Sequence, residues 1–386
     1  ELYCSYKDVI ALEKDDPVPY KICSFDIEAN SSHGDFPEAI KDYKKVAYDI
    51  IYYFKEYVTD DYEENMNEIF ENIFGFQETI IIDKCFPKEE YDYNKFKKDL
   101  DKLYKKNIST NRQIENKFKK YFQDDNDDYK SKITKIKQSD IITLITSETI
   151  DDPTKIIHLM ALLDSVFPKL SGDQVTFIGS TFVNYGEEKP YLNHCICLNK
   201  TDQVNENQVI ESYSREREVL IKWSELIRKE DPDIIIGYNI FGFDYPFMFE
   251  RAVELNCVED FMNIGRKDDS PNELFETSIV LASGPFDLKI IPMSGRLQID
   301  LYTYMRKEFN LTSYKLDYVS SYLISDYVTS YENINDTCKI YSKNLKGIEV
   351  NSFIHFEIQN HSTESYLDGK KFKILQLNKD SFIIDD

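Results

Sequence analysis

Two carboxylates stand two residues apart at the end of a short apolar segment. The segment is Lys21-Ile-Cys-Ser-Phe-Asp-Ile-Glu28, and its alternation of apolar and polar residues predicts a β-strand. Because side chains alternate across a strand, Asp26 and Glu28 share one face, while Phe25 and Ile27 share the other. Two such carboxylates repel each other unless a cation neutralises them, which suits Mg²⁺ or Mn²⁺. In a chain with 70 acidic residues, a solvated acidic strand face is the alternative.

A second group of candidate residues follows the apolar run 234–236, which is typical of a buried strand. Asn239, Phe243 and Asp244 come directly after this run. Active sites of α/β proteins gather where strands end, so Asp244 is a candidate ligand. Alternatively, Asp244 caps the helix that follows it and Phe243 is a core residue. The residues alone leave both alternatives open.

The carboxylates need a scaffold, and the sequence predicts a mixed α/β sheet for it. Strands are expected at residues 175–182, 192–198, 234–236, 286–291 and 296–301, and helices at 215–230, 245–256 and, as a pair, 302–324. His194, Cys195 and Cys197 could be metal ligands, but their alternation with apolar residues favours a half-buried strand.

Two further regions have a different character. Residues 41–171 predict amphipathic helices separated by acidic loops such as 124–128, and we interpret them as a solvated helical insertion. Its helices are expected at residues 43–54, 65–74, 96–104 and 156–167. Residues 350–386 alternate like strands, at 353–358, 372–377 and 382–384. We expect a small all-β module there, with His355 and His361 on its surface or facing a partner strand, and a metal-binding role for these histidines as the alternative.

Composition limits the class of protein. A chain of 386 residues with 41% hydrophobic residues can form one large domain or two to three smaller ones. It contains no apolar stretch of about 18 residues and begins with a charged segment, so membrane insertion and secretion are not expected. Seven cysteines without a C-x-x-C pair indicate reduced thiols inside a cell. The net charge of −23 argues against a broad phosphate-binding surface.

The two chemical segments resemble known motifs. Residues 23–28 resemble the first exonuclease motif of family B DNA polymerases, and Gly237-Tyr-Asn-Ile-x-x-Phe-Asp244 resembles the second. The resemblance is to delta-type eukaryotic polymerases and those of large DNA viruses. Flanking segments resemble the family in the same order, and together these matches cover roughly half the chain. They are residues 33–37, 212–232, 295–301 and 313–320.

The resemblance implies a ribonuclease H-like fold and a two-metal nuclease with Mg²⁺ or Mn²⁺, in which the ions lie about 4 Å apart. It implies that Asp26 bridges both ions and that Glu28 binds the ion that activates water. Asp244 would bind the ion at the leaving 3′ oxygen. Asn239 and Phe243 would contact the frayed DNA strand, the first by hydrogen bonds and the second by stacking.

The family's third motif, Tyr-x-x-x-Asp, has no clear match. Tyr322 and Asp326 have its spacing but come too early in the family's order, so we expect the true motif past Asp386. Such a chain would hold three of four metal ligands and be a weak nuclease alone. Asp300 and Asp317 are interpreted as structural. No segment resembles the polymerase palm motifs, so this chain is not expected to polymerise DNA, and the missing initial Met agrees with a truncated chain.

We therefore expect four parts. They are residues 1–40 with the first motif, 41–171 as the helical insertion, 172–330 as the rest of the exonuclease domain, and 331–386 as the β module. The expected function is that of the 3′-to-5′ proofreading exonuclease region of a replicative polymerase. A site that handles a few frayed nucleotides tolerates an acidic chain if the rest of the polymerase supplies the basic groove.

The expected partners are single-stranded DNA at a primer 3′ end, the remainder of the polymerase chain and a processivity factor, with no membrane. The expected location is intracellular, in the host nucleus or a viral replication compartment if the source is viral. Three alternatives remain. They are a silent exonuclease-like structural module, a stand-alone nuclease whose fourth ligand lies within the chain, and an acidic protein-interaction domain.

Overall fold

The computed structural model describes residues 4–11, 15, 18–31, 36–57, 59–78, 82–122, 132–203, 206–267, 272–281, 284–334, 337–345, 347–359 and 363–385. Contacts divide the chain into two compact units, residues 1–301 and 302–386. Each unit is described by itself. The acidic stretch 124–128, residues 33–35 and His361 lie outside the described residues.

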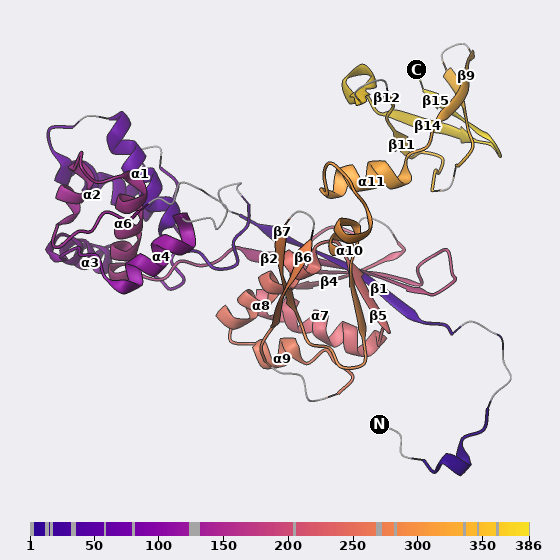
Figure 1. The fold of residues 1–386 in the computed structure, drawn as a ribbon, viewed down its shortest axis with the longest axis horizontal. Coiled ribbons are helices and arrows are strands. Elements are labelled where there is room, and N and C mark those ends of the chain that lie inside the picture. The colour runs from indigo at the N-terminus through magenta and orange to yellow at the C-terminus, as the bar shows by residue number, and fades with distance from the viewer. Residues whose placement is uncertain are drawn as a thin grey trace. The chain divides into compact units, whose positions relative to one another are not determined.

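A six-stranded mixed sheet forms the centre of the first unit (Figure 1). Its order is β4 (Gln208–Tyr213), β3 (Leu192–Leu198), β2 (Gln174–Asn184), β1 (Lys21–Asn30), β5 (Ile234–Gly237) and β8 (Leu297–Asp300). β1 is antiparallel to β2 and parallel to β5, and β8 is parallel to β5. A separate hairpin is formed by β6 (Phe275–Leu281) and β7 (Gly284–Ile290). The predicted mixed α/β class is therefore confirmed.

One side of this sheet packs on helices. These are α7 (Glu216–Glu230), α8 (Tyr245–Glu254) and α9 (Val258–Met262), which lie together in Figure 1. Phe25 of β1 is sandwiched there, with its ring centroid 4.8 Å from Trp223 and 5.5 Å from Tyr245. Because Phe25 faces the helices, Asp26 and Glu28 are exposed on the opposite side. The predicted alternation of β1 is thus confirmed.

Residues 44–166 form a helical segment with a hydrophobic core of its own. Its helices are α1 (Lys44–Glu56), α2 (Tyr62–Ile73), α3 (Tyr93–Lys105), α4 (Arg112–Phe122), α5 (Ile141–Thr146) and α6 (Asp152–Val166). The apolar pattern predicted four of these helices and missed α4 and α5. α4 has a clear apolar period: Ile114 and Phe118 are buried, and Tyr121 and Phe122 pack against the same core, so the sequence carried a signal for this helix that the prediction missed.

A buried ion pair anchors the helical segment to the sheet. Arg251 of α8 and Glu216 of α7 are joined by two hydrogen bonds, of 2.8 and 2.6 Å, and are almost fully buried. Arg251 also donates to the carbonyl of Ala39, where the chain enters the helical segment, and Glu216 accepts from the amide of Val175, where β2 begins. A Cβ at Gly172 would lie 1.8 Å from the Ala39 carbonyl oxygen, so this crossing requires glycine.

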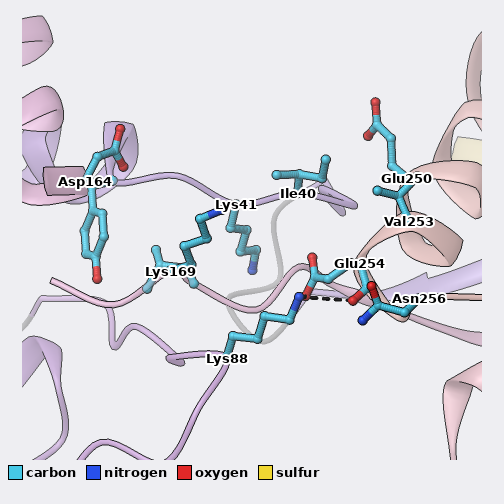
Figure 2. Close-up of a pocket in the computed structure, with 11 residues that line it drawn as sticks. Ile40, Lys41, Lys88, Asp164, Lys169, Glu250, Val253, Glu254 and Asn256 are labelled. Carbon is cyan, nitrogen blue, oxygen red and sulfur yellow. Dashed lines mark hydrogen bonds and ion pairs between the residues drawn. The ribbon is translucent and has the colours of Figure 1, made fainter.

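A groove of about 540 Å³ opens beside this anchor, between the helical segment and α8. Figure 2 shows Lys88 reaching the end of α8, where it pairs with Glu254. Lys41, which also lines the groove, pairs with Asp173 at 2.6 Å. Acidic and basic groups on the walls largely balance, so the groove is a salt-bridged junction rather than an anion site.

The second unit contains most of α10 (Leu301–Glu308), α11 (Leu316–Ile324) and a five-stranded sheet. The sheet order is β11 (Phe353–Ile354), β14 (Phe372–Leu377), β15 (Ser381–Asp385), β10 (Thr337–Ser342) and β9 (Val328–Ile334). A small hairpin adds β12 (Glu357–Gln359) and β13 (Thr363–Ser365). The segment 353–358, predicted as one strand, is split between β11 and β12, because Phe356 between them packs on Phe372 at 5.5 Å.

No helix within the described ranges has the length and apolar character needed to cross a membrane.

Candidate active site

β1 continues past the end of β5, and this offset places the two key carboxylates together. The parallel pairing of β1 with β5 runs from Ile22 to Ser24, and β5 ends at Gly237. Beyond that point the edge amide of Ile27 on β1 donates to Oδ1 of Asp244 at 3.3 Å. The side chain of Asp244 therefore takes the place of a strand partner and lies next to Asp26.

The carboxyl groups of Asp26 and Asp244 are hydrogen bonded to each other. Asp244 is only 2% exposed. Burial, and after it the charge of Asp26, raise the pKa of Asp244 to about 8. No Lys or Arg is among the groups with the largest effects on this pKa. Asp244 thus keeps its proton near neutral pH, and ionising both carboxylates would set two close negative charges against each other unless a cation neutralised them.

Asp244 does not cap α8. No side-chain capping hydrogen bond forms at the N-terminus of that helix, and the carboxylate is turned toward β1 instead. Asp244 ends a single π-helical turn, η2 (Ile240–Asp244), a conformation that often marks functional sites. Of the two alternatives left open by the sequence, the structure places Asp244 beside Asp26.

The turn before Asp244 is tightly packed. Asn239 adopts a left-handed conformation with φ of 64°. A Cβ at Gly242 would lie 2.3 Å from Oδ1 of Asn239, and a Cβ at Gly237 would lie 2.4 Å from Cγ2 of Ile240. Glycine at these two positions lets the chain reverse at the end of β5 and fixes where the Asn239 amide lies.

Asp300, at the end of β8, holds this turn in place. It is opposite Gly237 in the β5–β8 register, and its carboxylate accepts from the amides of Asn239 at 2.8 Å and Phe241 at 3.3 Å. The sequence-based interpretation of Asp300 as structural fits these contacts. Its role as the support of Asn239 was not foreseen, although its place at the end of the next parallel strand could have indicated it.

Phe243 lies in a small aromatic cluster. Its ring centroid is 5.2 Å from Phe36 and 5.3 Å from Phe247. Phe247 is buried, whereas Phe36 is 74% exposed and Phe243 is partly buried. The Phe243 ring thus packs against the buried ring of Phe247 on one side and against the exposed ring of Phe36 on the other. Phe36 belongs to the segment 33–37, whose first three residues lie outside the described ranges.

The metal-ligand set is partial. Asp26 and Asp244 meet, and Glu28 lies on the same face of β1 two residues away. In the part of the chain that the structure describes, no group of three or more His, Cys, Asp or Glu side chains is close enough to hold a metal ion. The raised pKa and the missing counter-charge fit a divalent cation at the Asp26–Asp244 pair, with further ligands still needed.

Other sequence candidates lie elsewhere. Tyr322 and Asp326 belong to the second unit, where Asp326 accepts hydrogen bonds from the amides of Tyr327 and Asn344 and the hydroxyl of Ser342. These contacts give Asp326 a local structural role.

The predicted strand at 192–198 is confirmed as β3, and its possible metal ligands do not gather. The Sγ atoms of Cys195 and Cys197 lie 3.6 Å apart, while His194 contacts Glu211. No metal-binding group of three such side chains forms among the residues the structure describes.

Comparison with known proteins gives a consistent picture. Residues 103–319 match the family model described as DNA polymerase family B, exonuclease domain, a range that includes Asp244 but begins after Asp26. Over its full length the chain is 36% identical to a DNA polymerase of Phaeocystis pouchetii virus, of which it covers 41%.

Two further relatives agree. The chain is 30% identical, over 91% of its length, to a DNA polymerase of Pyramimonas orientalis virus, of which it covers 29%. Over 42% of its length it is 33% identical to the DNA polymerase delta catalytic subunit of Candida albicans, of which it covers 15%. It thus spans less than half the length of each of these relatives.

Proposed function

The chain belongs to the family B DNA polymerases and carries their exonuclease domain, and from this premise we propose that it removes nucleotides from the 3′ end of single-stranded DNA in proofreading. The observation that carries the proposal is the hydrogen-bonded pair of Asp26, within β1, and Asp244, in the turn after β5. Exonuclease domains of this family depend on divalent metals, which this pair suits.

The proposal extends to the fold and the division of the chain. The central sheet is ribonuclease H-like, with residues 1–40 and 172–330 building the exonuclease domain around a helical insertion at 41–171. Residues 331–386 form a β module inserted before the third motif. In support, residues 44–166 have their own core and the sheet brings β1 next to β5 across that insertion.

We assign the catalytic roles to residues on the open face of β1 and the turn after β5. Asp26, Glu28 and Asp244 would hold two Mg²⁺ or Mn²⁺ ions. When bound, such ions supply a hydroxide nucleophile at neutral pH and stabilise the leaving oxygen. Asp26 contacts Asp244 and shares a face of β1 with Glu28, so it is suited to bridge. Asp244 must lose the proton that its raised pKa retains before it can act as a ligand.

The DNA contacts come from the same turn. Asn239, fixed by Asp300 and Gly242, would direct its amide to the frayed strand. Phe243, supported by Phe247 on one edge, would stack on a base together with the exposed Phe36.

The activity of the whole polymerase, its partners and its location are also proposals. We propose that the chain acts as part of a longer polymerase with a processivity factor, inside the cell in the host nucleus or a viral replication compartment. The remaining polymerase sequence would supply the tyrosine and fourth carboxylate of the third motif. The 386-residue chain alone should then be a weak nuclease.

Polarity is the direct test. A single-stranded oligonucleotide with a 5′ label should shorten in steps with Mn²⁺, and the same oligonucleotide with a 3′ label should release labelled mononucleotide at once. A version that continues into the third motif should do both faster. If neither version releases mononucleotide from either end, the domain is a catalytically silent structural module.

A further inference from the structure

Helices α3 and α4 differ from the rest of the chain in charge. Residues 93–122 contain ten Lys or Arg residues against three Asp or Glu, a net charge of +7. The whole chain has a net charge of −23, so all other residues together carry −30. Every residue of 93–122 is described, and nine of the ten basic side chains are exposed. A basic segment of this size in an acidic chain indicates a binding surface for an anionic partner.

The lysines of α3 form a stripe. Phe96, Leu100 and Leu103 are buried against the core of the helical segment. Lys98, Lys102 and Lys105 recur three or four residues apart on the side of the helix away from these buried residues, and Lys95 and Lys106 extend the stripe. Lys98 and Lys105 have no ion pair or hydrogen bond among the contacts of the described residues.

The stripe continues onto α4 past a pocket of about 270 Å³ that polar and apolar residues line together. The pocket is lined by Lys106 at the end of α3, by Asn107 in the link, and by Gln113 and Lys117 of α4. Lys106 donates to Ser165 at 2.8 Å and Lys117 pairs with Asp164 at 2.9 Å, so both ammonium groups meet at the end of α6. Lys106 and Lys117 thus connect the basic residues of α3 to those of α4 at the end of α6.

The far end of this surface approaches the exonuclease core. Lys120 lies one turn after Lys117 on α4. Burial raises the pKa of Glu250 on α8, while the charges of Lys289 and Lys120 lower it, which places Lys120 near that helix. α8 begins at Tyr245, the residue after Asp244.

We propose that this lysine track, made of Lys98, Lys102, Lys105, Lys106, Lys117 and Lys120, binds the sugar–phosphate backbone of DNA and holds the strand whose end is processed at Asp26. The proposal rests on the proposed function for its choice of DNA. Nine of the ten basic residues in 93–122 are lysine, which binds phosphate as a point charge and without the paired geometry by which arginine reads bases. The track would thus bind without regard to sequence.

Salt-dependent binding is the test. The chain, in EDTA so that no cleavage occurs, is titrated against a labelled 20-nucleotide thymidine oligonucleotide while anisotropy is recorded at several salt concentrations. The variant Lys98→Gln/Lys102→Gln/Lys106→Gln should bind at least about tenfold more weakly. The slope of log affinity against log salt should fall by about 2, since each lost phosphate contact on a single strand contributes about 0.7.

The matched control removes the same charge elsewhere. Lys343, Lys371 and Lys379 are exposed lysines of the second unit, and their triple change to Gln should leave both affinity and slope nearly unchanged. Equal losses of DNA affinity in the two triple variants would overturn the proposal, because the net charge of the chain and not the position of the lysines would then explain binding. Unchanged binding by the track variant would overturn it too and would leave the track to an acidic protein partner.

Cleavage of two substrates separates this inference from the proposed function. A trinucleotide that places its scissile phosphate at Asp26 leaves at most one phosphate for the track, so the track variant should cleave it at the normal rate and the 20-mer more slowly. If a version that continues into the third motif also cleaves neither substrate, the proposed function fails, while the binding result still decides whether the track holds DNA. Circular dichroism melts confirm that both triple variants are folded.

Discussion

Asp244, which ends the turn after β5, lies beside Asp26 of β1, and its carboxylate accepts the amide of Ile27 that β5 is too short to reach. These aspartates are 218 positions apart in the chain, with the whole helical segment between them. Their meeting is produced by the parallel pairing of β1 and β5. The predictions below follow from this contact and from the residues that support it.

The first prediction concerns stability without metal. In the folded chain the pKa of Asp244 is about 8, against about 3.9 for an unperturbed Asp. Its contribution to stability is therefore fully present below pH 4 and is lost as the pH rises to 8. Asp244→Asn removes this loss, so in EDTA at pH 8.5 it should raise the free energy of unfolding by on the order of 2 kcal/mol. At pH 5 the gain should be smaller, and equal gains at both pH values would contradict the assignment. Urea titrations measure both.

The second prediction concerns metal affinity. A cation must displace the proton that Asp244 holds, so Mn²⁺ affinity should rise about tenfold per pH unit from pH 6 to pH 8 and level off above. Calorimetry in buffers of different ionisation enthalpy should show release of about one proton at pH 7. Asp244→Asn serves as the control and should show weaker binding with little dependence on pH. A parent chain with pH-independent affinity would exclude Asp244 as a ligand.

The third prediction concerns Asp300 as a positioning residue. Asp300→Ala leaves the partly buried amide of Asn239 and the buried amide of Phe241 without their acceptor, which costs about 1–3 kcal/mol for a buried amide and less for a partly buried one. The turn should shift, so nuclease activity should fall more than the population of folded protein does. Asp300→Asn keeps one acceptor oxygen and should recover part of the activity. If both variants lose stability but keep the activity of the folded fraction, Asp300 does not position the turn.

A fourth prediction tests the anchor of the helical segment. Arg251→Met leaves the buried carboxylate of Glu216 without its guanidinium partner and should lower the free energy of unfolding by about 3–5 kcal/mol. Glu216→Gln should cost less, because the guanidinium keeps its ion pair with Glu254 at 3.0 Å. The double variant should be less destabilised than the sum of the two, which a double-mutant cycle measures. Additive losses would mean that the pair is not coupled.

Much of the sheet could be predicted from the sequence. Alternating apolar residues predict β2 and β3, and an apolar run predicts β5. A helical period that ends before a proline predicts α7. All four elements form where they were expected. Local pattern was enough for these elements because each buries one regular face. α4 could have been predicted in the same way, because Ile114, Phe118 and Phe122 recur four residues apart between charged residues.

The site could be predicted only in part. Asp26 and Glu28 were identifiable because strand alternation places them on one face, and Asp244 because it follows a buried strand. The support of Asn239 by Asp300 depends on the register of two parallel strands, which no local pattern specifies. Whether Asp244 caps α8 or lies beside Asp26 likewise depends on how far β1 extends past the end of β5.

The most direct test of the account is whether Asp26 and Asp244 act as one unit in cleavage. Single-turnover removal of the 3′ nucleotide from a 5′-labelled oligonucleotide would be measured in Mg²⁺ for a chain that continues into the third motif. The variants are Asp26→Ala, Asp244→Ala and the double change. We predict that each single change lowers the rate by about a thousandfold or more and that the double change lowers it no further, because groups that act together are not additive. Rapid cleavage by either single variant, or losses that multiply in the double variant, would contradict the account.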